Sequence, residues 1–154
     1  WKSEVAYALA YHKVFDALEA ENSASCEKLA EGLELQAFVL CKYMDAGKNF
    51  HLLAQDKSTK EFSLTPHGKL LTVDGGQRDF LLFVNRSAKN AWRAAGTQLM
   101  KEGGGETKKG GWDMYYGEPV WEYISKVPEE EAEFGRAMAA FSDGPSGAVI
   151  SDWK

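Results

Sequence analysis

The chain has 154 residues, of which 44% are hydrophobic and 27% are charged. This length and balance fit one globular domain with a core of its own, and they exclude a disordered chain. The net charge of −5 disfavours a nucleic-acid partner, because an acidic surface repels the phosphate backbone. No apolar run approaches the roughly 18 residues that a membrane-spanning helix needs.

A first helix is expected over residues 3–20, because apolar side chains recur there at helical spacing. Its apolar face is wider than a single core requires, which favours contact with a protein partner as well. The expected partner face consists of Tyr7, Tyr11, Val14, Phe15 and Leu18.

Two shorter helices follow. Ser25 is placed to cap the first of them, which runs through Ala30 and ends at Gly32. The second is expected over Leu35–Ala46, and Gly47 is expected to stop it. Two short helices joined by a glycine-containing turn are typical of a helix-turn-helix.

A two-stranded wing comes next. Residues 50–55 and 61–65 have the composition and alternation of strands, with a polar turn between them. Thr65 and Pro66 then predict the start of a helix that runs to Leu71. This order predicts a mainly α fold: a winged helix-turn-helix with a small two-stranded β wing and additional C-terminal helices.

The rest of the chain is predicted to be a helical extension. It comprises a long helix over residues 78–101, a flexible glycine-rich loop over 102–111, a short helix near 119–124 and a last helix opened by Pro128. A single domain is therefore expected over residues 1–154, with a winged-helix core at about 5–72 and the extension at about 78–142.

Two cysteines, Cys26 and Cys41, are too few for the disulfide framework of a small secreted protein. The favoured interpretation is two reduced, packed thiols, because free cysteine is among the most buried residue types. This predicts a reducing compartment: the cytoplasm, or the matrix or stroma of an organelle. The first residue is Trp1 rather than methionine, so an upstream targeting segment stays an open alternative.

No catalytic, cofactor-binding or metal-ligating residues are predicted. The glycines at 103–105 follow a predicted helix, whereas a phosphate-binding loop follows a strand. The turn at 73–76 has no buried strand leading into it, and no Cys, His or carboxylate pair has the spacing of a known metal site. The acidic run at 129–133 is better explained as the solvated start of a helix.

Two features leave alternatives open. The helix that would read DNA carries Glu34, Gln36, Lys42 and Asp45, so it offers almost no net positive charge. Nucleic-acid binding is therefore disfavoured.

The aromatic residues over 112–123 fit core packing and a ligand pocket or protein interface equally well.

Four stretches of the chain resemble the N-terminal dimerisation domain of S-adenosylmethionine-dependent O-methyltransferases of the plant caffeate, flavonoid and hydroxyindole type. They are Val14–Leu18, Cys26–Ala30, Leu40–Gly47 with Phe50 and Phe62–Leu71, and Trp121–Tyr123 with Pro128–Glu129 and Phe134–Met138. The resemblance implies a winged-helix domain that pairs two enzyme copies through its helices. It also implies an acceptor-pocket wall or interface that includes Trp121, Phe134 and Met138.

In that family a cofactor-binding domain follows, and no residues here match its glycine-rich turn. The predicted function is therefore a non-catalytic dimerisation or protein-interaction domain, which is not an enzyme on its own. It has no cofactor of its own, and S-adenosylmethionine would belong to a C-terminal catalytic domain where one exists. The alternatives are an accessory or scaffold subunit of a larger complex, for instance in an organelle, and a winged-helix DNA-binding protein.

Overall fold

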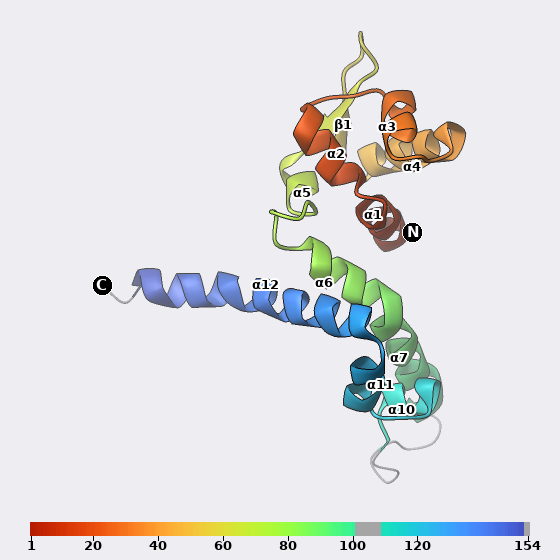
Figure 1. The fold of residues 1–154 in the computed structure, drawn as a ribbon, viewed down its shortest axis with the longest axis vertical. Helices are drawn as coiled ribbons and strands as arrows, with labels where there is room; N and C mark the ends of the chain where they lie inside the picture. Colours follow the sequence, from red (N-terminus) through yellow and green to blue (C-terminus); the bar gives the residue numbers. More distant parts are fainter. Residues whose placement is uncertain (101–108, 153–154) are drawn as a thin grey trace. The chain divides into compact units, whose positions relative to one another are not determined.

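The structure is a computed structural model that describes residues 1–100 and 109–152 (Figure 1). The chain divides into two compact units, Trp1–Leu81 and Leu82–Lys154. The described residues are mostly helical and contain one two-stranded antiparallel sheet, which confirms the mainly α fold class with a β wing. Among these residues, no helix is long and apolar enough to cross a bilayer.

The first unit has the element order of a winged helix. Its elements are α1 (Lys2–Tyr11), α2 (Val14–Glu21), α3 (Cys26–Gly32), α4 (Ala37–Asn49), β1 (Leu53–Gln55), β2 (Phe62–Leu64) and α5 (Pro66–Lys69). In the antiparallel wing Leu53 pairs with Leu64. The side chain of Ser25 accepts a hydrogen bond at the start of α3, and that of Thr65 does so at the start of α5. Both predicted caps are thus confirmed.

The prediction of a single helix over residues 3–20 is wrong, because the chain turns between α1 and α2. Lys13 has a φ of 58°, in the left-handed region that a continuous right-handed helix excludes. The turn changes which side chains face the interior. Val14, Phe15 and Leu18 of α2 are all 0% exposed and belong to the core of the first unit.

Gly47 lies inside α4, so the prediction that it stops this helix is also wrong. It is buried, and a Cβ atom on it would lie 3.1 Å from Leu9 Cδ1 of α1. The missing side chain therefore serves the close approach of α4 to α1, and the helix continues to Asn49.

The turn between β1 and β2 projects from the first unit (Figure 1). The carboxylate of Asp56 holds it in shape. Its Oδ1 accepts hydrogen bonds from the Ser58 hydroxyl and from the amides of Ser58 and Thr59, the latter two at 2.7 and 2.9 Å. These bonds, the Ser58 hydroxyl first, lower the pKa of Asp56 from 3.8 to about 2. Because the folded pKa is the lower one, the bonds stabilise the fold fully above pH 3.8, and this contribution is lost as the pH falls through 2.

A carboxyl NMR titration of the folded chain is accordingly expected to give Asp56 a pKa near 2. The variant Asp56→Asn should lose the part of the acid-dependent change in stability that lies between pH 3.8 and 2. A measured pKa near 3.8 would show that the turn does not hold the carboxylate in this way.

Helices make up most of the described residues after Gln77. They are α6 (Arg78–Phe83), the π-helical η1 (Val84–Ala88), α7 (Lys89–Ala94), the π-helical η2 (Ala95–Leu99), α10 (Gly111–Tyr116), α11 (Val120–Lys126) and α12 (Pro128–Asp152). The predicted long helix is confirmed through Leu99, as an unbroken series with two π-helical segments. The predicted short helix after Pro119 and the last helix from Pro128 are also present.

The expected glycine-rich loop over 102–111 lies largely outside the described residues, but its last residue can be placed. Gly111 begins α10 rather than ending a loop. A Cβ atom on it would lie 2.2 Å from the Ala91 carbonyl oxygen and 2.8 Å from Ala95 Cβ. Glycine is therefore required where α10 packs against α7.

Candidate functional site

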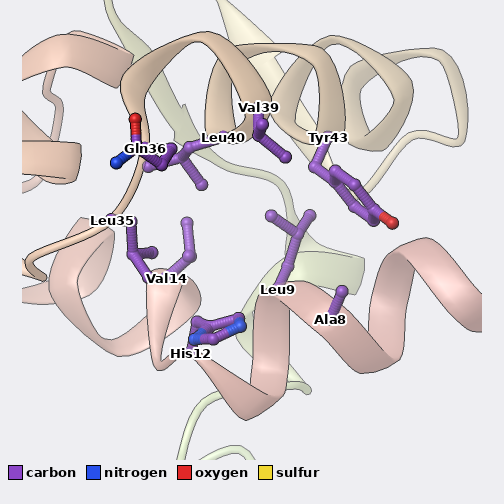
Figure 2. Close-up of a pocket in the computed structure, with 9 residues that line it drawn as sticks. All are labelled: Ala8, Leu9, His12, Val14, Leu35, Gln36, Val39, Leu40 and Tyr43. Carbon is purple, nitrogen blue, oxygen red and sulfur yellow. The ribbon is translucent and has the colours of Figure 1, made fainter.

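An apolar groove lies between α1 and α4 in the first unit, with a volume of about 300 Å³ (Figure 2). Figure 2 shows the side chain of Leu9 on α1 directed across the groove toward Val39 and Leu40 on α4. The Tyr43 hydroxyl points outward. The residues that line the groove are Ala8, Leu9, His12, Val14, Leu35, Gln36, Val39, Leu40 and Tyr43. Their mostly aliphatic character suits an apolar occupant.

A second pocket, of about 400 Å³, lies between the same two helices and shares Tyr43 with the groove. Its lining is Trp1, Glu4, Val5, Lys42, Tyr43 and Ala46. The two pockets and the exposed apolar side chains beside them form one area, here named the α1–α4 surface. Phe38 is 76% exposed there, and Tyr11 and Val39 are each 51% exposed. Apolar side chains that cluster on a surface in this way are typical of a protein interface.

The residues expected to form a partner face lie in two different environments. Val14, Phe15 and Leu18 are fully buried within the first unit, so they cannot form an exposed face in this chain. Tyr7 and Tyr11 remain partly exposed on α1, with their rings stacked at a centroid distance of 5.8 Å. Of the five, only these two are exposed in the single chain, although Val14 also lines the groove.

Sequence reasoning missed the contribution of α4 to this surface. Phe38, Val39 and Tyr43 are exposed, whereas Leu40 and Met44 on the same helix are buried. The signal was present, since a helix with one buried stripe does not need apolar residues at 38, 39 and 43 as well. The charged residues of this helix, which bear on DNA reading, do not report on its exposed apolar face.

The second unit brings together two of the three residues expected to wall an acceptor pocket. The rings of Trp121 and Phe134 pack edge to face, with centroids 5.4 Å apart, and Phe83 packs on Phe134 at 5.1 Å. Met138 follows Phe134 by one turn of α12, so it lies on the same side of that helix. Trp121 is 65% exposed, which leaves most of its ring free for a ligand or a partner.

A buried polar cluster in the same unit ties η1 to α12. The Ser87 hydroxyl donates a hydrogen bond to the Glu130 carboxylate, and both residues are buried. The Tyr116 hydroxyl donates to the Ser87 carbonyl oxygen at 3.0 Å. Burial raises the pKa of Tyr123, and the nearby charge of Glu130 adds to this rise. The cluster thereby fixes the start of the helix that carries Phe134.

Replacing Ser87 with alanine is expected to lower the free energy of unfolding by about 1–3 kcal/mol, because a buried carboxylate oxygen loses its hydrogen-bond donor. The matched control is Ser125→Ala, since the exposed Ser125 hydroxyl donates only to the carbonyl oxygen of Glu122 on its own helix. Urea unfolding of both variants gives the comparison. Equal losses in the two variants would mean that the buried bond of Ser87 contributes no more to the free energy of unfolding than the exposed bond of Ser125.

Cys26 and Cys41 form a disulfide, so the prediction of two reduced thiols is wrong for this structure. The bond joins the first residue of α3 to the middle of α4, where the two Cα atoms are 5.2 Å apart. The helix-turn-helix brings the two residues together, which a sequence separation of 15 does not show. The reducing compartment remains a prediction.

Neither a family model nor a curated protein matches the chain. Solved structures do match it. The structure of LaPhzM has a TM-score of 0.82 and 19% identity, over 98% of this chain and 44% of that one. The mitomycin 7-O-methyltransferase MmcR gives 0.80 and 19%, over 98% and 43%. Human N-acetylserotonin methyltransferase gives 0.75 and 21%, over 90% and 41%.

The chain therefore has the fold of one part of methyltransferase chains, and it spans less than half of the length of the structures it matches. This confirms the resemblance at the level of the fold. Nearly full coverage of this chain, with partial coverage of the others, shows that the likeness is to one part of those chains.

Proposed function

We propose that these 154 residues form the pairing domain of an O-methyltransferase-like protein. The domain binds a second copy through the α1–α4 surface and does not transfer methyl groups by itself. The observation that carries this proposal is the match of almost the whole chain to less than half of each methyltransferase chain.

The chemistry of the α1–α4 surface supports the pairing role. Its two pockets are lined mainly by apolar side chains, with His12 and Gln36 at the groove and Glu4 and Lys42 beside Tyr43. An apolar centre with polar groups at its margin is the usual composition of a stable interface. Two-fold pairing uses the same patch on both copies, so one self-complementary surface is sufficient.

The second unit has a separate role in this proposal. Trp121, Phe134 and Met138 contribute one wall of an acceptor pocket when a catalytic domain is present. Aromatic rings packed edge to face offer flat apolar faces that suit a planar acceptor. S-adenosylmethionine belongs to the catalytic domain, and we assign no residue of this chain to it.

Isothermal titration of the chain with S-adenosylmethionine tests the non-catalytic part of the proposal. We expect no binding heat at micromolar concentrations, because no residues here are assigned to the cofactor. The Trp121→Ala variant serves as a matched sample, since it should behave like the wild-type chain. Micromolar binding by the chain alone would contradict the proposal.

An accessory subunit is the second candidate, and the same surface favours it. An apolar surface of this kind also fits a different protein as its partner. The two candidates differ in solution: a pairing domain associates with itself, whereas an accessory subunit requires another chain. Sedimentation equilibrium of the chain alone separates them.

A further inference from the structure

A cluster of metal-ligating side chains lies where α3 meets α4, outside both surfaces described above. The sulfur atoms of Cys26 and Cys41 and a carboxylate oxygen of Glu27 all lie within 4.8 Å of one another. Cys26 is buried, Cys41 is partly exposed and Glu27 is exposed, so solvent reaches the cluster from the side of Cys41 and Glu27. Its members come from two helices, and the fold brings them together.

A carboxylate oxygen of Glu27 lies near the sulfur of Cys41, which is part of the disulfide. Glu27 Oε1 lies 3.8 Å from Cys41 Sγ. A disulfide sulfur carries no hydrogen, so this contact cannot be a hydrogen bond while Cys26 and Cys41 are joined. After reduction the Cys41 thiol can donate to that oxygen, or a cation can replace the thiol protons and bind all three atoms. In the reduced state Glu27 thus offers an acceptor for the thiol or a third ligand for a cation.

We propose that the reduced chain binds one Zn²⁺ ion through Cys26, Cys41 and Glu27, and that this site and the disulfide exclude each other. Thiolate and carboxylate are both common zinc ligands, and a tetrahedral ion keeps its fourth position for water. Bonds of about 2.3 Å from zinc to each sulfur place the two sulfurs about 3.8 Å apart. Rotation about the Cα–Cβ bonds permits this spacing at a Cα separation of 5.2 Å.

The change of state is balanced in electrons and protons. A dithiol reductant passes two electrons to the disulfide and becomes a disulfide itself, while each cysteine sulfur gains a proton. Zinc binding then releases these two protons to water, because the metal binds thiolates. The partial exposure of Cys41 gives the reductant access to the bond.

The test uses the full chain, reduced and then freed of reductant under argon, and titrated with Cd²⁺ as a spectroscopic substitute for Zn²⁺. We expect one ion per chain, with an ultraviolet charge-transfer band from cadmium–thiolate bonds. Cys41→Ser and Cys26→Ser should each lose the band. Glu27→Gln should bind at least about tenfold more weakly, since changes even to residues behind the ligands cost 10–100-fold. A large excess of Zn²⁺ should compete with Cd²⁺ for the same site and reduce the band.

Glu31→Gln is the matched control, because Glu31 is an exposed carboxylate on the same helix and outside the cluster. It should bind like the wild-type chain, and circular dichroism should show that every variant keeps its helices. The oxidised chain should bind no cadmium. Equal binding by the oxidised and reduced chains would overturn the proposal. Equal weakening by Glu27→Gln and Glu31→Gln, or an unchanged band in both serine variants, would overturn it as well.

Discussion

Replacing Phe15 with alanine is expected to lower the free energy of unfolding of the first unit by about 3–5 kcal/mol. Phe15 is 0% exposed, beside Val14 and Leu18 in the sequence of α2, so truncation leaves a cavity in the core. The change can be measured by urea unfolding followed by circular dichroism, with the disulfide kept oxidised in all samples.

Phe38→Ala is the matched control, since the same side chain is removed from a position that is 76% exposed. Its stability should stay within about 0.5 kcal/mol of the wild-type value when the chain is monomeric. The comparison also decides the role of Phe15, which was expected at a partner face. A small loss of stability in Phe15→Ala would show that Phe15 does not belong to the core.

Replacing Val39 with aspartate is expected to weaken self-association at least about 100-fold, which is about 2.7 kcal/mol. Val39 lines the groove and is half exposed in the single chain. In the pair a carboxylate at this position would be removed from water with no partner charge, and such burial is costly. Sedimentation equilibrium of the wild-type chain and the variant measures the difference.

Val73→Asp is the control for this experiment. Val73 is also exposed in the first unit, and it does not line either α1–α4 pocket. It should leave association unchanged. A wild-type chain that stays monomeric at millimolar concentration would contradict pairing and favour the accessory role. If Val39→Asp associates as tightly as Val73→Asp, a different surface forms the pair.

Local chemistry made a large part of the fold predictable. The caps at Ser25 and Thr65 appear where sequence reasoning expects them, because a side-chain oxygen that precedes a helix satisfies its free amides. The wing was predictable from alternation, and Phe62 is indeed buried in β2. The last helix follows from Pro128 and the acidic residues after it.

The errors arise where tertiary packing decides the local structure. Lys13 is not glycine, so its residue type does not predict a positive φ. The apolar side chains also continue at helical spacing past it, which is the pattern of one continuous helix. Gly47 has the sequence signature of a helix end, but it serves the contact with Leu9. Both outcomes depend on how α1, α2 and α4 pack together.

The candidate sites were predictable only in part. Trp121 and Phe134 were expected to act together and do touch. The groove between α1 and α4 was not foreseen, because it depends on how two separate helices lie against each other. The bond between Cys26 and Cys41 was missed for the same reason.

Pairing of two copies through the α1–α4 surface can be observed most directly by isotope-filtered NMR. In a mixture of carbon-13-labelled and unlabelled chains, only contacts between copies give filtered nuclear Overhauser effects. We expect these effects at the methyl groups of Leu9, Val39 and Leu40, which lie at the groove (Figure 2). Effects confined to other parts of the chain, such as the β1–β2 wing, or none at millimolar concentration, would contradict the proposed pairing.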